Sequence, residues 1–126
     1  MSDHGDLLDP CPATPNCVSS LAGRDSQRVA PLVVNGDPDA AMHTLREVVE
    51  SLPRTRVKAF SPEGMHVVFT SRILRFRDDV EFALAREDGV IHVRSASRVG
   101  HSDLGANRRR VEHLRALLSQ ENSAAE

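Results

Sequence analysis

Residues 74–98 read LRFRDDVEFALAREDGVIHVRSASR, and the alternation of their side chains is the clearest structural signal in the chain. Apolar and polar residues alternate on both sides of Asp88-Gly89, which is the pattern of half-buried strands. An Asp-Gly pair between two such runs is a strong signal for a hairpin turn. We therefore predict two antiparallel strands, 74–86 and 90–98, with Phe76 on the apolar face.

Shorter strands precede this hairpin in the sequence. Residues 54–60 and 65–70 are rich in Val and Phe and flank a turn at 61–64, so they predict a second antiparallel pair. Residues 28–34 predict one more short strand, which Pro31 confines to an edge of the sheet or breaks early.

Two helices complete the predicted elements. Asp37-Pro38 gives an N-cap followed by proline at the first helical position, and apolar residues then recur at helical spacing, which predicts a helix over 38–51. A second apolar stripe predicts a final helix over about 104–119, with Ser102 and Asp103 as candidate N-caps.

The predicted order of elements is β-α-β-β-β-β-α, with hairpin-linked strands between two helices. This order implies an α+β fold, in which an antiparallel sheet of four to five strands carries both helices on one face. The alternative is a more curved sheet that wraps the last helix and leaves a cavity. We divide the chain into an irregular N-terminal arm docked on the core (1–27), a single α+β domain (28–119) and a disordered tail (120–126).

Composition and charge argue against several classes of function. A net charge of −2 creates no global field that favours nucleic acid or membranes, and a chain without Trp or Tyr offers little surface for stacking bases. No apolar run approaches the roughly 20 residues of a membrane span, and residues 1–10 lack the features of a signal peptide. We therefore expect a cytoplasmic protein without a nucleic-acid or membrane partner, and the sequence leaves the oligomeric state open.

Polar residues interrupt the apolar face of the long hairpin. Asp78, Ser95 and Ser97 have the same parity as its buried residues, and a buried carboxylate must have a partner because an unpaired buried charge is very costly. The start of the last helix brings Asn107 inward, with Arg108 beside it. We predict that these residues converge near a helix N-terminus, where anions are favoured.

The other face of the hairpin carries charges. A tight turn places Val80 opposite Ser97 and Asp79 opposite Arg98, and Glu81 and Arg94 complete a charged lattice. Cross-strand pairs of this kind are worth roughly 0.2–1 kcal/mol each. A solvated, charge-paired face explains these residues fully if that face is exposed.

Three segments together resemble a known family: CPATPNCVSS (11–20), FRDDVEF (76–82) and RSASRVGHSDLGANRRRVE (94–112). The chain resembles the domain-of-unknown-function family 1499 of bacteria and photosynthetic eukaryotes over about residues 7–118. That family has no established activity. Many relatives look exported or membrane-anchored, but this chain shows no such leader, so we do not carry that location over. The resemblance implies that these polar positions are family features: Asn16, Cys17, Ser19, Ser20, Asp78, Asp79, Glu81, Arg94, Ser95, Ser97, Arg98, Gly100, Ser102, Asp103, Asn107 and Arg108.

Cys11 and Cys17 lie close together in a Pro-rich loop. In a reducing compartment they are expected to be thiols, although a disulfide is geometrically possible and would suit exported relatives. The two cysteines do not have the spacing of a zinc site, and no second ligand pair accompanies them. Neither cysteine has a nearby base that would make it a nucleophile. We favour docking of the arm through Asn16, Cys17 and Val18, and we predict no metal and no cofactor.

Three hypotheses remain for the polar cluster. The first is a non-catalytic module for a small anionic ligand or an acidic segment of a protein partner, with Asp78 orienting an arginine. The second is a small enzyme, a hydrolase or isomerase, with Asp78 or His101 as the acid or base. The third is a packing network that fixes the helix on the sheet. In the first hypothesis the ligand-binding residues are Asp78, Arg94, Ser95, Ser97, Arg98, Asn107 and Arg108.

Overall fold

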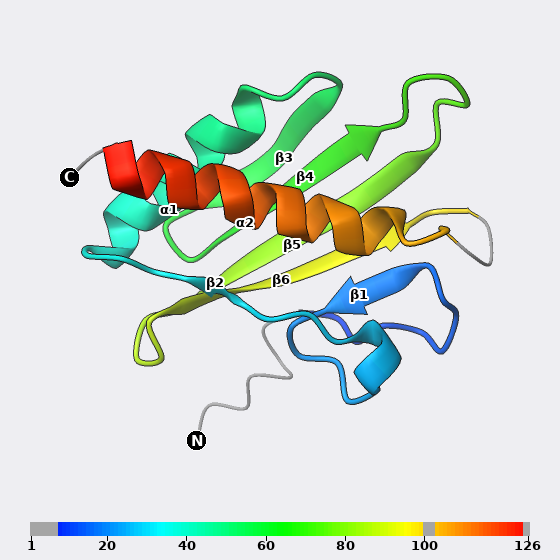
Figure 1. The fold of residues 1–126 in the computed structure, drawn as a ribbon, viewed down its shortest axis with the longest axis horizontal. Helices are drawn as coiled ribbons and strands as arrows, with labels where there is room; N and C mark the ends of the chain where they lie inside the picture. Colours follow the sequence, from blue (N-terminus) through cyan, green and yellow to red (C-terminus); the bar gives the residue numbers. More distant parts are fainter. Residues whose placement is uncertain (1–7, 100–102, 125–126) are drawn as a thin grey trace.

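The fold is built around the long hairpin of β5 (Arg77–Ala85) and β6 (Val90–Ser97), which forms the middle of the sheet (Figure 1). The structure is a computed structural model that describes residues 8–99 and 103–124. The remaining elements are β1 (Cys17–Ser19), the 3-10 helix η2 (Asp25–Gln27), β2 (Leu32–Val33), α1 (Pro38–Glu50), β3 (Thr55–Ser61), β4 (Gly64–Thr70) and α2 (Ala106–Ala124).

The strands form one antiparallel sheet in the order β1-β6-β5-β4-β3, and β2 pairs with β6 beside β1. Both helices lie on the same face of this sheet (Figure 1). The predicted α+β fold is therefore confirmed. The additional strand is β1, which lies inside the predicted arm and is too short for its alternation to be recognised in the sequence.

The core lies between the sheet and the two helices. Apolar side chains from both helices pack there against the inward residues of the central strands, as the helical and strand periodicities predicted. The residues without any exposed surface include Met42, Leu45 and Val49 of α1, Val111 of α2, and Val67, Val80, Ile91 and Val93 of the sheet.

The local sequence predicted the start of the first helix correctly, but not the start of the last helix. The Asp37 carboxylate accepts a hydrogen bond from the Asp39 amide at 3.3 Å and Pro38 is the first helical residue, so the predicted start of α1 is confirmed. The last helix differs at both ends from the predicted 104–119. Leu104 has a φ of 53°, which prevents a helical start at that residue.

At its other end α2 continues to Ala124, into the segment that we expected to be a disordered tail. No glycine or proline interrupts residues 119–124, so the local sequence contains no strong stop signal.

The turn of the long hairpin is wider than predicted. Ala85 is the partner of Val90, so residues 86–89 form a four-residue loop in which the Asp88 amide donates to the Ala85 carbonyl at 3.2 Å. Val80 therefore lies opposite Ser95 and not opposite Ser97. The register moves by two residues, which leaves every side chain on its predicted face because the period of a strand is two.

The first strand of the hairpin starts later than predicted. β5 begins at Arg77, and residues 71–76 form the connection from β4. Ser71 and Phe76 close this connection, because the Ser71 amide donates to the Phe76 carbonyl at 2.8 Å. Phe76 is consequently exposed and does not join the core as expected.

The two cysteines form a disulfide, so the prediction of free thiols is wrong. That prediction rested on an expected reducing compartment and not on geometry. Pairing of β1 with β6 fixes Cys17 in a buried position, and the arm returns so that the Cα atoms of Cys11 and Cys17 are 5.7 Å apart. The bond thus ties the arm to the edge of the sheet.

Neither helix in the described part of the chain combines the length and the apolar composition needed to cross a bilayer.

Reduction of the disulfide is expected to lower the free energy of unfolding by about 2 kcal/mol, because the open chain gains conformational entropy when unfolded. Urea unfolding with and without dithiothreitol measures this difference. The reductant should have no effect on a Cys11→Ser variant. Equal stability of the oxidised and reduced protein would contradict a stabilising role for this bond.

Candidate functional site

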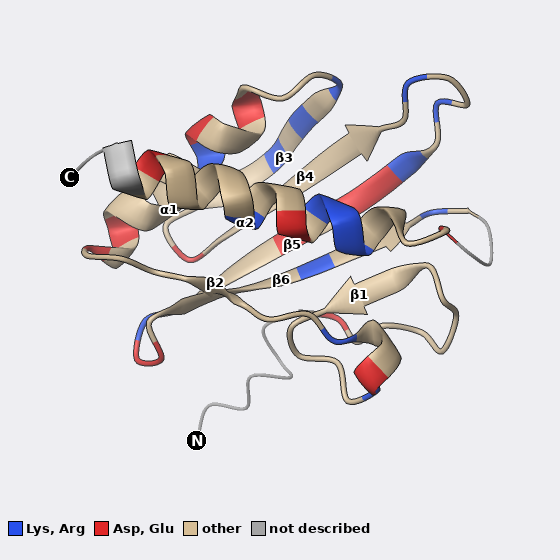
Figure 2. Ribbon diagram, viewed as in Figure 1, with Lys and Arg blue, Asp and Glu red and all other residues tan. Residues whose placement is uncertain are grey.

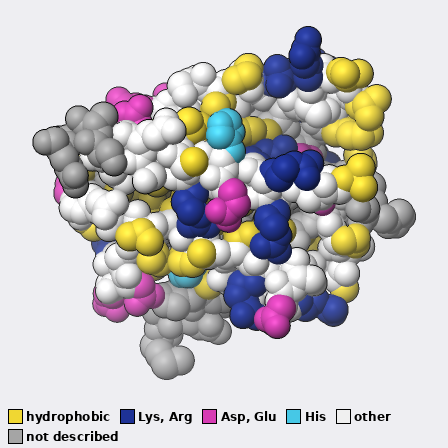
Figure 3. All heavy atoms as spheres, viewed as in Figure 1, with side chains coloured by type: hydrophobic (Ala, Val, Ile, Leu, Met, Phe, Trp, Pro, Cys, Tyr) yellow, Lys and Arg dark blue, Asp and Glu magenta, His cyan; other side chains and the backbone are white. Residues whose placement is uncertain are grey.

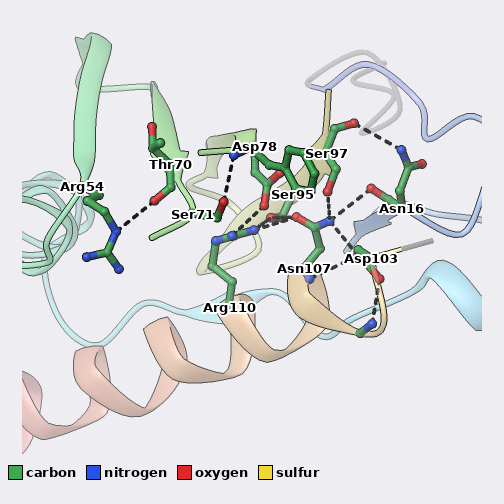
Figure 4. A network of polar contacts seen from close by, with 12 residues as sticks. Asn16, Arg54, Thr70, Ser71, Asp78, Ser95, Ser97, Asp103, Asn107 and Arg110 are labelled. Carbon is green, nitrogen blue, oxygen red and sulfur yellow. Dashed lines mark hydrogen bonds and ion pairs between the residues drawn. The ribbon is translucent and has the colours of Figure 1, made fainter. Parts of the chain in front are cut away.

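Four of the five polar residues predicted to converge, Asp78, Ser95, Ser97 and Asn107, meet where the open end of the long hairpin lies under the start of α2 (Figure 4). Ser95 and Asn107 are fully buried, and the Ser95 hydroxyl donates to Asn107 Oδ1 at 2.6 Å. Asn107 Nδ2 donates to Ser97 Oγ at 3.0 Å and to the Asn16 carbonyl at 3.1 Å. One amide side chain therefore joins helix, sheet and arm.

Arg110 supplies the positive charge of this cluster. Its Nη2 lies 2.7 Å from Asp78 Oδ2, and its Nη1 donates to Asn107 Oδ1 at 2.7 Å and to Ser95 Oγ at 3.2 Å. The guanidinium also lies over the ring of Phe69, 4.9 Å from its centroid. The Asp78 side chain is only 10% exposed, so this ion pair answers the requirement that a buried carboxylate have a partner.

Arg110 was missed in the sequence, although a signal was present. Asn107 and Arg110 are three residues apart and therefore lie on the same side of a helix. Arg110 also belongs to a run of three arginines, 108–110, and such runs usually lie on a solvated helix face. The predicted orientation of an arginine by Asp78 matches the observed contact, with Arg110 in place of the arginines that we had named.

The structure places the three predicted arginines elsewhere. Arg94 and Arg98 lie on the opposite face of β6 from Ser95 and Ser97, because successive side chains of a strand alternate. Arg108 donates to the backbone carbonyls of Arg28 at 3.0 Å and Ser26 at 2.9 Å. It fastens the arm to the helix and does not join the cluster.

The opposite face of the sheet carries the charged lattice that we predicted, and it is only partly exposed. Arg98 Nε donates to Asp79 Oδ2 at 2.8 Å, and His66 Nε2 lies 2.8 Å from Asp79 Oδ1. The hydrogen bond from Arg98 lowers the pKa of Asp79 to about 2, against the opposing effect of burial and with help from His66. Arg94 pairs with Glu81 at 3.4 Å and also reaches the arm, where it donates to the Pro10 carbonyl.

Asp103 occupies the N-terminus of α2. Its carboxylate accepts from the amides of Gly105 at 2.8 Å and Asn107 at 3.2 Å, so it satisfies donors at the helix start. Burial raises the pKa of Asp103, but the hydrogen bonds from Asn107 and Gly105 outweigh that effect and lower it. The anion that we expected at this helix terminus is thus the carboxylate of Asp103. Two other residues that we had considered, Ser102 and His101, lie outside the described residues.

An open hollow of about 350 Å³ lies beside Arg110, between the end of α1, the end of β4 and the first turns of α2. Figure 3 shows Lys and Arg side chains gathered around a recess on this face. Arg54 Nε donates to the Thr70 carbonyl at 3.1 Å, and Arg109 Nη1 donates to the Leu104 carbonyl at 2.8 Å. The seven residues that line the hollow include no carboxylate: Leu52, Pro53, Arg54, Phe69, Arg109, Arg110 and His113.

The donors around this hollow suit an anion and not a metal ion. Guanidinium groups offer only N–H donors, whereas metal ions require lone pairs from His, Cys, Asp or Glu. Within residues 8–99 and 103–124, no three such side chains are grouped so that they could hold a metal ion.

Comparison with known protein families gives a match over most of the chain. Residues 7–118 match the model of a family described as "Protein of unknown function (DUF1499)". The match covers every strand and most of the last helix, and it confirms the resemblance seen in the three sequence segments. No curated protein matches the chain. The comparisons therefore assign no activity, and the geometry of the site has to suggest one.

Replacement of Asp78 by Ala is expected to lower the free energy of unfolding by about 3–5 kcal/mol, because it leaves Arg110 buried without its counter-charge. Arg110→Ala should cost a similar amount, and the double variant should cost clearly less than the sum of the two. Urea denaturation of the four proteins measures the coupling. Glu63→Ala, which removes an exposed partner of Arg86, is the control and should change stability little. Additive effects of Asp78→Ala and Arg110→Ala would contradict the buried pair.

Ionisation of Asp79 should make the free energy of unfolding depend on pH in the acid range. Its pKa is about 2 in the folded chain and near 3.8 when unfolded, so its contribution is complete above about pH 4 and is lost as the pH falls toward 2. The stability difference between the wild-type protein and Asp79→Asn should therefore shrink over that range. Urea unfolding at pH 5 and pH 2.5 tests this, and a difference that stays constant would refute the assigned shift.

Proposed function

The chain belongs to the DUF1499 family, and we propose that it is a non-catalytic binding module whose ligand is a small anion held in the hollow beside Arg110. The observation that carries this proposal is the composition of the hollow. Three arginines and one histidine line it without a carboxylate, and two apolar side chains, Leu52 and Phe69, are among its walls. Guanidinium groups can bind an anion, and an apolar wall beside them can contact an apolar part of the same ligand.

Arg54 and Arg109 provide the binding groups. Both are exposed, and each is anchored by one hydrogen bond to a backbone carbonyl. A guanidinium has five N–H donors, so each arginine keeps donors for a carboxylate or phosphate. Anchoring restricts these long side chains before a ligand arrives, which reduces the entropy lost on binding.

Arg110 plays a different part because Asp78 balances its charge. Its contacts with Asp78, Asn107 and Ser95 fix the guanidinium against Phe69, on one side of the hollow. The buried network thus acts as packing, as our third hypothesis holds, and it also shapes the wall of the proposed site. An anion with an apolar body fits such a wall better than a bare inorganic ion.

The same geometry favours binding over catalysis. The seven lining residues contain no carboxylate, thiol or hydroxyl that could act as a nucleophile. Asp78, the candidate acid or base, faces Arg110 and is almost completely buried. An acidic segment of a protein partner stays the alternative ligand, since a Glu or Asp side chain presents the same carboxylate to Arg54 and Arg109. A cytoplasmic location also stays a prediction.

Phenyl phosphate combines a strong anion with an apolar ring, and we expect it to raise the melting temperature through linkage. Calorimetric titration should show Arg54→Gln and Arg109→Gln to bind at least about ten-fold more weakly, because each loses charge-assisted hydrogen bonds. Arg56→Gln is the control, since Arg56 is an exposed arginine of β3 that does not line the hollow.

Inorganic phosphate should bind more weakly than phenyl phosphate if the apolar wall contributes. The proposal is wrong if neither compound nor a Glu-rich peptide binds the folded protein. It is also wrong if Arg56→Gln weakens binding as much as Arg54→Gln does, because the effect would then be that of overall charge.

A further inference from the structure

The connection between β4 and β5 exposes large apolar side chains. Ile73 is 83% exposed and Leu74 is 68% exposed, and Phe76 follows at 48%. Single exposed apolar residues are common, but three within four positions at the end of one hairpin form a patch. These side chains add nothing to the core of the described structure.

This connection, residues 71–76, is held in one conformation by its own hydrogen bonds. The Ser71 amide donates to the Phe76 carbonyl at 2.8 Å, and the Phe76 amide donates to Ser71 Oγ at 2.8 Å. Residues 72–75 form the loop between these two residues. Arg75 there has a φ of 60°, a left-handed conformation that is unfavourable for a residue with a side chain. The tip presents its apolar side chains outward at a cost to local stability.

Arginines alternate with the apolar residues of the tip. Arg72, Arg75 and Arg77 are all exposed, and none of them has an ion-pair partner among the described residues. Residues 71–77 contain no acidic side chain, and Asp78, which follows them, turns inward to Arg110. Figure 2 shows the resulting positive charge along this connection and at the start of β5.

We propose that this tip, residues 72–77, docks on an anionic membrane surface. Ile73, Leu74 and Phe76 enter the boundary between headgroups and acyl chains, and the three arginines bind lipid phosphates. An apolar face combined with flanking Lys or Arg is the pattern that binds anionic lipid interfaces. A projecting hairpin tip suits a deformable lipid surface, whereas a protein partner would need a matching pocket.

Two further exposed apolar residues lie at the same end of the sheet. Val99 follows β6, and the hydrogen bond from the Arg98 amide to the Arg77 carbonyl at 3.1 Å places it near the base of the tip. Leu104, 84% exposed, precedes α2 in another left-handed conformation. Figure 3 shows hydrophobic side chains along this edge of the molecule. The apolar surface that faces the bilayer in the proposed orientation is therefore broader than the tip alone.

The overall charge of −2 argued against a membrane partner, but the charges are unevenly distributed. Glu87 and Asp88 lie in the loop at the other end of β5, where Arg86 pairs with Asp39 of α1 and with Glu63. Salt screens charges beyond about 10 Å, so a surface that meets the tip responds to the nearby arginines and not to the distant carboxylates. The tip also shares no residue with the hollow of Arg54 and Arg109.

The absence of Trp and Tyr from the chain provides a sharp test, because one introduced Trp reports its own surroundings. Leu74→Trp should show blue-shifted fluorescence with vesicles of phosphatidylcholine and phosphatidylglycerol, and no shift with phosphatidylcholine alone. Val33→Trp, at an exposed apolar position of β2 outside the tip, is the matched control and should not shift.

Co-sedimentation of the wild-type protein with the same vesicles measures affinity. Replacing Ile73 and Leu74 by Ser should weaken binding at least about ten-fold, since both lose their burial in the interface. Arg72→Gln and Arg75→Gln should each weaken it about five-fold. Arg54→Gln and Arg109→Gln should bind vesicles like the wild type, which separates this proposal from that of the hollow.

Three results would overturn the membrane proposal. The first is no shift of Leu74→Trp with anionic vesicles while circular dichroism shows a folded protein. The second is an equal shift for Leu74→Trp and Val33→Trp. The third is a shift that depends on protein concentration without vesicles, which would make a second copy of the chain the occupant of the tip.

Discussion

The ion pair between Asp78 and Arg110 is the interaction on which the assembly of sheet, last helix and arm depends. A carboxylate on the apolar face of β5 is tolerated only with a counter-charge, and α2 has to lie where Arg110 can supply it. Arg110 also donates to Asn107, whose side-chain amide reaches Ser97 of β6 and the Asn16 carbonyl of the arm. The ion pair is therefore part of a network that links β5, β6 and α2 with the N-terminal arm, which is distant from them in sequence.

The pairing of buried donors with carboxylates also explains where the surface is basic. Asp78 satisfies Arg110, and Asp103 satisfies amides at the start of α2, so the chain's own anions take the buried donors near the open end of the hairpin. The arginines of the outer face are balanced by Asp79 and Glu81. The arginines without a carboxylate partner at this end of the molecule lie at the surface, in the hollow and at the β4–β5 tip. Both proposals rest on this residual positive charge.

Much of the buried cluster could be predicted, because a register error of two residues does not change the face on which a strand side chain lies. The turn at residues 86–89 is wider than expected, yet a shift of two residues leaves Asp78, Ser95 and Ser97 on their predicted face. Helical spacing likewise placed Asn107 inward. The basic hollow could not be predicted, since Arg54 and Arg109 belong to segments that only the packing of α2 against the end of β4 brings together. The exposure of Phe76 was missed because a strand pattern does not reveal where a turn begins.

Local periodicity predicted the two helices, the longer strands and the face of each strand, and the energy of a buried charge required a partner for Asp78. Which arginine is that partner depends on how the elements pack in three dimensions. Five arginines between residues 94 and 110 have the same chemistry, and their long side chains reach in several directions: Arg94, Arg98, Arg108, Arg109 and Arg110. The choice of arginine depends on the position of α2 over the sheet. The disulfide bond of Cys17 likewise depends on the pairing of β1 with β6. Both involve contacts between segments that are far apart in the chain.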